Sequence, residues 1–227
     1  MRYRGGLAVE IPNRGARAPD ASRLDLLVEA SAQRDAAFTV RGPRPSEPEE
    51  VDATLVRWRR ADDSLDAFSL ELDGSPLQFP RVVARDADTV ALLPQGPTSG
   101  SLWLVSLLGD DAVERRLWAD PALSETALDA RWAMGALLYL RGNSERTCLE
   151  RHASGRTDTL LCVDGLFPAI RAVDADGFLL ASAEGEHRRF DWSGRELERL
   201  PTERGRFLDV WGDGTLVVVD SSGATLT

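Results

Sequence analysis

One pattern recurs along this chain: an apolar run leads to a polar turn, a second apolar run follows, and the unit ends at a glycine. It is clearest in IRAVDADGFLLASAEG (Ile170 to Gly185), and VVARDADTVALLPQG (Val82 to Gly96) repeats it. A fixed period of this kind indicates one supersecondary unit that is repeated several times. Equivalent positions stand 37 to 46 residues apart, at Ala84, Ala130, Ala172 and Asp209.

The repeated units are predicted to consist of short strands. Gly, Asp or Pro interrupts them every few residues, and apolar residues alternate in between. Each unit divides into four strands, which in the fourth unit are FPAIRAV, GFLLASA, HRRFDWS and RELERLP (residues 167–201). A looser first unit contains the Pro- and Glu-rich loop of residues 43–50. The fifth unit, residues 206–227, is incomplete, and we expect residues 1–12 to supply its missing outer strand.

This pattern resembles that of β-propellers. With five short units, it is similar to the small five-bladed group that includes tachylectin-type lectins, although it carries neither a WD dipeptide nor a Kelch double glycine. The resemblance covers essentially the whole chain and implies an all-β fold: a single five-bladed β-propeller over residues 1–227, closed by the N-terminal strand. The alternative is an α+β fold, if residues 110–140 are helical. That segment is rich in helix formers, and Ser124 is a suitable cap.

Charge and composition restrict the partners of this chain. Asp and Glu total 37 against 27 basic residues, all arginine, and the formal net charge is −10. Neither nucleic acid nor an anionic membrane surface is therefore an expected partner. The absence of lysine is typical of GC-rich, bacterial-like coding. No apolar stretch approaches the roughly 20 residues that span a bilayer, and the start lacks a secretory apolar region. We expect a cytoplasmic location.

The two cysteines, Cys148 and Cys162, flank a segment that resembles a hairpin turning at Ser154-Gly155. Such a hairpin would place them across from each other, and a disulfide is then sterically feasible. A cytoplasmic location favours two free thiols instead. Two cysteines and two histidines lack the spacing of a zinc site, so we expect no metal and no cofactor.

No residue set predicts catalysis. Asp86 and Asp174 begin D-A-D turns that resemble the start of a calcium loop, but the further ligands are missing. We expect these aspartates to accept hydrogen bonds from backbone amides. In a propeller, the first strand of each unit is the innermost one and lines the central channel. Glu29, Asp129 and Asp209 fall on or near these predicted innermost strands. A glycosidase-like enzyme that uses channel carboxylates is therefore one alternative.

The expected function is a non-enzymatic binding module, namely a scaffold that binds another protein. A carbohydrate-binding propeller lectin is the second alternative. The candidate binding residues lie in the loops that enter innermost strands or near the ends of those strands, where an aromatic ring can anchor a protein or stack on a sugar. For the aromatic residues among them, core packing is the competing interpretation. These candidates are Leu77, Phe79, Trp132, Leu166, Phe167 and Trp211.

Overall fold

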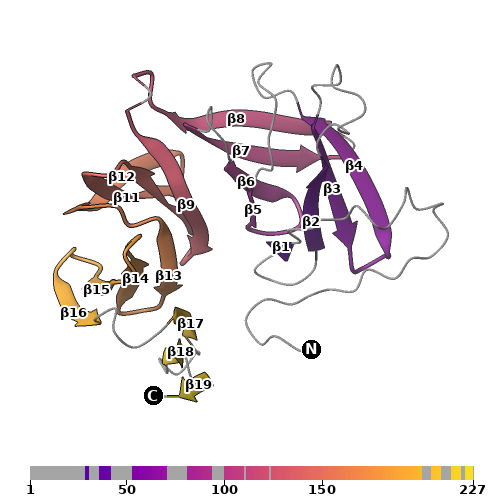
Figure 1. Cartoon of the computed structure of the whole chain (residues 1–227). Helices are drawn as coiled ribbons and strands as arrows, with labels where there is room; N and C mark the ends of the chain where they lie inside the picture. The colour runs from indigo at the N-terminus through magenta and orange to yellow at the C-terminus, as the bar shows by residue number, and fades with distance from the viewer. Residues whose placement is uncertain are drawn as a thin grey trace, which may run out of the picture. The chain divides into compact units, whose positions relative to one another are not determined.

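The computed structural model shows an all-β protein (Figure 1). It describes residues 29–30, 36–41, 53–70, 81–93, 100–109, 111–122, 124–200, 206–210, 216–220 and 223–226. These residues form strands and turns and no helix, which confirms the all-β expectation for this part of the chain. A membrane-spanning helix is likewise absent from the described residues. The chain divides into two compact units, Met1–Trp118 and Ala119–Thr227.

The first compact unit, Met1–Trp118, contains two four-stranded sheets whose strands pair in chain order. The first of them consists of β1 (Glu29–Ala30), β2 (Ala36–Arg41), β3 (Ala53–Arg59) and β4 (Ser64–Leu70). The second consists of β5 (Arg81–Ala84), β6 (Thr89–Leu93), β7 (Ser101–Leu108) and β8 (Asp111–Ala119). Strands β1 and β2 lie beside β5, so the two sheets approach each other through their first strands.

The second compact unit, Ala119–Thr227, contains two four-stranded sheets and one three-stranded sheet, and their strands also pair in chain order. The first is β9 (Thr126–Ala133), β10 (Ala136–Gly142), β11 (Arg146–Ala153) and β12 (Arg156–Asp164). The next is β13 (Ala169–Val173), β14 (Gly177–Ala181), β15 (His187–Asp191) and β16 (Glu196–Leu200). The last is β17 (Arg206–Val210), β18 (Leu216–Asp220) and β19 (Gly223–Leu226). Strand β13 lies beside both β9 and β17.

Each unit buries its apolar residues between neighbouring sheets. In β7, the alternate residues Trp103, Val105 and Leu107 are buried, because successive side chains of a strand point to opposite faces. In β10, Leu138 and Leu140 belong to the core of the second compact unit, and the residue between them is buried as well. Full burial of one such side chain contributes about 1.5–3 kcal/mol. The cluster in the second unit consists of Leu138, Leu140, Leu149, Phe167, Ile170, Phe178, Leu180 and Phe190.

The described antiparallel sheets follow the repeated units in chain order, and the helical alternative for residues 110–140 is wrong. Strands β8, β9 and most of β10 occupy that segment. Met134 and Gly135 make a two-residue turn between β9 and β10, both with positive φ, which fits the twist of a tight hairpin. Pairing with neighbouring strands outweighs the helix propensity of these residues.

The structure tests one of two further expectations and does not describe the residues of the other. Asp86 and Asp174 accept hydrogen bonds from the backbone amides of Asp88 and Asp176, at 2.9 Å in both turns, as predicted. Residues 1–12, expected to complete the fifth sheet, lie outside the described residues. Ring closure, the number of blades and a single domain over residues 1–227 therefore stay predictions.

Candidate functional site

The sheet β9–β12 has two differently built ends. Thr126, Gly142, Thr147 and Val163 are cross-strand neighbours at one end. We define the loop end as the connections at this side: residues 120–122 with 124–125, 143–145, 164–168 and, from the next sheet, 182–186. We define the turn end as the opposite side, with residues 134–135, 154–155, 174–176 and 192–195.

Asp120 organises the first loop of the loop end. Its carboxylate accepts hydrogen bonds from the backbone amides of Ala122 (2.9 Å), Ser124 (2.7 Å) and Glu125 (2.8 Å), and from the Ser124 hydroxyl (2.8 Å). These donors, the Ser124 hydroxyl above all, lower the pKa of Asp120 to about 2, because they stabilise the charged carboxylate. The loop is therefore folded around one side chain.

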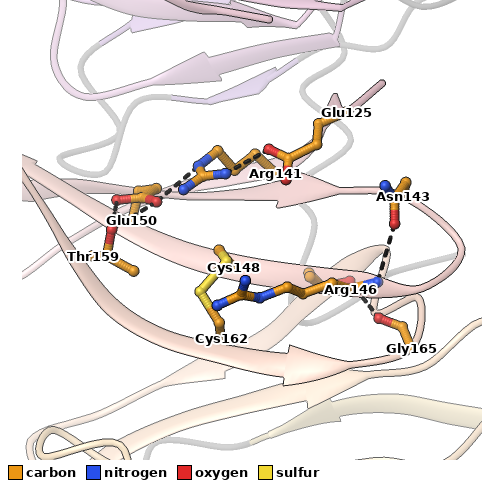
Figure 2. Close-up of a disulfide and its surroundings, with 10 residues drawn as sticks. Glu125, Arg141, Asn143, Arg146, Cys148, Glu150, Thr159, Cys162 and Gly165 are labelled. Atoms are coloured by element: carbon orange, nitrogen blue, oxygen red, sulfur yellow. Dashed lines mark hydrogen bonds and ion pairs between the residues drawn. A yellow bond between two sulfur atoms is a disulfide. The ribbon is translucent and has the colours of Figure 1, made fainter. Parts of the chain in front are cut away.

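Asn143 joins this loop to the next one. Its Nδ2 donates to the Ser124 carbonyl at 3.2 Å. Its Oδ1 accepts hydrogen bonds from the amides of Glu145 (2.9 Å) and Arg146 (3.1 Å), and Figure 2 shows the bond to Arg146. One amide side chain therefore satisfies the backbone of two connections.

Thr147 holds the third loop. Its hydroxyl donates to the Gly165 carbonyl at 2.8 Å and accepts from the Phe167 amide at 2.9 Å. The Gly165 amide in turn donates to the Glu145 carbonyl at 2.7 Å. The fourth loop is attached through the Ala183 amide, which donates to the Leu166 carbonyl at 2.9 Å. The four loops of the loop end therefore form one hydrogen-bonded surface.

The loop end is acidic. Its loops contain six carboxylates and no arginine: Asp120, Glu125, Glu145, Asp164, Glu184 and Glu186. Guanidinium groups of the adjacent strands neutralise some of them. Arg188 lies 2.8 Å from Glu186, and its guanidinium carbon lies 5.0 Å from the centre of the Phe167 ring.

A buried polar network lies behind this surface, as Figure 2 shows. Arg141 of β10 forms ion pairs with Glu125 of the first loop and, at 2.8 Å, with Glu150 of β11. Glu150 is only 3% exposed and also accepts a hydrogen bond from Thr159. Burial, together with the Glu150 charge, raises the pKa of Tyr139 to about 12, so this phenol stays protonated. The network connects the loop to the sheet.

The structure separates the residues that the sequence grouped together. Leu166 is half-buried within the loop end. Phe167 is 2% exposed and packs in the core, which fits the core interpretation of this side chain. Trp132 is half-buried on β9 opposite Leu137, at the turn end, so Trp132 and Leu166 do not share one surface. The other three candidates lie outside the described residues: Leu77, Phe79 and Trp211.

The carboxylates considered for catalysis are only partly described. Asp129 is 2% exposed, and its carboxylate accepts hydrogen bonds from the amides of Ala130 (2.8 Å) and Ile170 (2.7 Å). The bond from Ile170 connects β13 to β9, which is a structural role. Glu29 and Asp209 lie on β1 and β17, where only the backbone is described. Among the described residues, no group of three His, Cys, Asp or Glu is placed to hold a metal ion.

The expectation of two free thiols is wrong. Cys148 and Cys162 form a disulfide, with their Cα atoms 4.1 Å apart (Figure 2). The cause is the register of β11 and β12, in which the two residues are direct cross-strand partners. The predicted turn at Ser154-Gly155 is confirmed, since both residues have positive φ.

Sequence reasoning missed the residues that hold the loops together. Asp120, Asn143 and Thr147 carry no motif that predicts a site. Two of them left a weak signal, because Asp and Asn before small or polar residues often bond to nearby backbone amides. The bonds of Thr147 reach 18 and 20 residues along the chain, and no local pattern predicts them.

Comparison with known proteins identifies the fold but no family. No family model and no curated protein matches the chain. Among solved structures, a prolyl endopeptidase aligns with a TM-score of 0.58 and 14% identity, over 86% of this chain and 33% of its own. Dipeptidyl peptidase 4 of Porphyromonas gingivalis aligns with a TM-score of 0.57 and 12% identity, over 88% of this chain and 38% of its own. A protein from Lactobacillus plantarum gives 0.54 and 11% identity, over 88% and 69%.

These similarities show a β-propeller-like fold. The chain spans 33% and 38% of the two peptidases, so it corresponds to only one part of each. At such low identity the likeness extends to the fold alone, and many functions share this fold.

Proposed function

We propose that this chain is a non-enzymatic binding module that docks another protein through its loop end. The observation that carries the proposal is the hydrogen bonding of three loops by Asp120, Asn143 and Thr147 and of the fourth by the Ala183 amide. A surface that is ordered before binding loses less conformational entropy when the partner arrives. Loops held by a rigid scaffold are also the usual place for binding residues.

The composition of the loop end supports a protein partner of a particular kind. Leu166 is half-buried and supplies apolar contact area, while exposed carboxylates such as Glu145 and Asp164 surround the loops. Apolar anchors with a polar rim are typical of protein interfaces. Since the loops contain only acidic charges, we expect a basic surface on the partner. Association should then be faster at low salt.

Substitution of Leu166 tests this proposal. The partner is isolated by pull-down from the native cell and identified, and its affinity is then measured by calorimetry with purified protein. Leu166→Asp should weaken binding at least tenfold, because it places a charge at the centre of the interface. Met134→Asp at the turn end is the matched control, since Met134 is 69% exposed and should leave the affinity unchanged.

Three outcomes would contradict the proposal. Equal affinity of Leu166→Asp and the unaltered chain would place the binding surface elsewhere. Multivalent binding on a glycan array without any stoichiometric protein partner would favour the lectin alternative. Turnover of a glycoside that Asp129→Asn or Asp209→Asn abolishes would favour the enzyme.

We also propose that the ring is closed as the repeat pattern predicts, with residues 1–12 completing the fifth sheet. The support is the strand count among the described residues, where β17–β19 has three strands and each of the other sheets has four. An unpaired sheet edge is a site of association. Deletion of residues 1–12 should therefore cause aggregation or a lower melting temperature. A monomeric truncated protein that melts like the intact chain would contradict closure.

A further inference from the structure

The disulfide lies directly behind the loop end. Cys148 adjoins Thr147, whose hydroxyl holds Gly165 and Phe167. Cys162 is two residues before Asp164, where the third loop begins. The covalent bond therefore fixes the two strands close to the hydrogen bonds that shape residues 164–168 (Figure 2).

Strand β12 is attached to β11 by its ladder and by side-chain bonds such as that of Thr159 to Glu150, but it buries little apolar surface. It is the outermost strand of its sheet and pairs only with β11 in the observed strand order. None of its side chains is buried, although Leu160, Leu161 and Val163 pack against the core from the side. Elements with little buried apolar surface open locally at low free-energy cost. A cross-link near the end of such a strand limits this opening.

We propose that the Cys148–Cys162 disulfide is a redox-sensitive clamp that holds the 164–168 loop in its binding form. The proposal rests on the proposed function of the loop end. In a reducing cytoplasm, disulfides are typically transient or redox-sensing, which is consistent with a clamp that opens and closes.

The chemistry is ordinary thiol–disulfide exchange with a dithiol reductant. A thiolate of the reductant attacks Sγ of Cys162, the less buried of the two residues, and the bond between the two sulfurs breaks. Cys148 leaves as a thiolate and takes up a proton. The second thiol of the reductant then displaces Cys162, so the protein gains two electrons and two protons and the reductant becomes a disulfide.

Hydrogen exchange measures the clamp without any partner. The amides of Gly165 and Phe167 donate to Glu145 and Thr147 and should exchange at least tenfold faster after reduction. The amide of Gly177, which begins β14 in the next sheet and donates to Asp174 at 2.9 Å, serves as the control and should not change. The double variant Cys148→Ala/Cys162→Ala should exchange like the reduced protein and should not respond to reductant.

Unchanged exchange at Gly165 and Phe167 in both the reduced protein and the double variant would overturn the clamp. Faster exchange with no effect of Leu166→Asp on partner binding would support the clamp but contradict the proposed function.

A second measurement tests the switch in the cell. Thiols are trapped by alkylation at lysis, and the peptides that contain Cys148 and Cys162 are weighed. Both redox forms should occur, and their ratio should change when cells are treated with dithiothreitol or diamide. A cysteine pair that stays fully oxidised under every treatment would be a permanent structural disulfide and would contradict the redox-sensitive clamp.

Discussion

The chain reverses direction at both ends of the sheet β9–β12, but the connections at the two ends are held in different ways. At the turn end of this sheet, the two-residue turns 134–135 and 154–155 reverse the chain with positive φ at Met134, Gly135, Ser154 and Gly155. At the loop end, the connections are longer, and the side chains of Asp120, Asn143 and Thr147 satisfy their backbone groups.

This difference shows where each end is sensitive to substitution. The turns 134–135 and 154–155 depend on conformations that glycine adopts easily, whereas the loop end depends on particular side chains and on close backbone contacts. Substitutions in the loops can therefore change what the loop end recognises, but only while the side chains that bond to the loop backbone are kept. The predictions below test this comparison.

The largest effect is expected for Phe167, which belongs to the loop end and is buried in the core. Phe167→Ala should destabilise the protein by about 3–5 kcal/mol, because it leaves a cavity and removes buried apolar surface. Met134→Ala at the turn end should change the free energy of unfolding by less than about 0.5 kcal/mol. Chemical denaturation measures both. Equal effects of the two substitutions would contradict the comparison.

Two glycines separate steric from conformational causes. A Cβ at Gly142 would lie 2.2 Å from the Arg146 carbonyl oxygen, whereas a Cβ at Gly155 would meet nothing within 4 Å. We expect Gly142→Ala to cost about 2–3 kcal/mol through this clash. Gly155→Ala should cost about 1 kcal/mol through its positive φ.

Asparagine variants at the same two positions show whether these causes are correct. Asparagine tolerates positive φ, so Gly155→Asn should be less harmful than Gly155→Ala. Gly142→Asn should be at least as harmful as Gly142→Ala, since the larger side chain meets the same carbonyl. Thermal melting ranks all four variants, and the same ranking at both glycines would show that the causes do not differ.

The hydrogen bonds of Thr147 should have a moderate effect. Thr147→Val keeps the shape of the side chain but leaves the Phe167 amide without its acceptor, which should cost about 2 kcal/mol. Thr126→Val, at an exposed position of the same end, is the matched control with little expected change. A Thr147→Val protein as stable as the control would show that water replaces the hydroxyl.

The smallest expected effect is the loss of stability at acidic pH through the protonation of Asp120. Since the folded pKa of Asp120 is lowered to about 2, its contribution is complete above the ordinary pKa of 3.8 and is lost as the pH falls towards 2. Ser124→Ala should raise the pKa of Asp120, because the Ser124 hydroxyl is the main cause of the shift. A carboxyl titration by NMR measures this pKa. An unchanged midpoint would show that the backbone amides alone hold the charge.

The repeat pattern predicted most of the strands because the information is local. Each strand of the sheet β13–β16 ends near a turn signal such as Asp176-Gly177 or Ser193-Gly194, and the observed boundaries differ by only a few residues. The hairpin that contains the two cysteines was predicted in the same way, but its register was not. The turn at Ser154-Gly155 alone would place Cys148 opposite Leu161, and the irregularity between Leu149 and Glu150 shifts the register so that Cys148 faces Cys162. The expected cytoplasmic location favoured free thiols.

The site was harder to predict because it depends on strand direction and on distant bonds. The sequence places Leu166 in a loop that enters an innermost strand and Trp132 near the end of one, but a strand that enters at the loop end finishes at the turn end. Trp132 therefore lies a strand length away. The bond from the Ile170 amide to Asp129 joins residues 41 positions apart, and no sequence pattern marks such a pair.

The strand order has a consequence for how the protein forms. Within every described sheet, each strand pairs only with the strands before and after it in the chain. Contacts between residues close in sequence form quickly, since little loop entropy is lost when they meet. Each sheet is therefore complete as soon as its last strand has been synthesised. Assembly can proceed on the ribosome in the order of synthesis, before the C-terminal sheet exists.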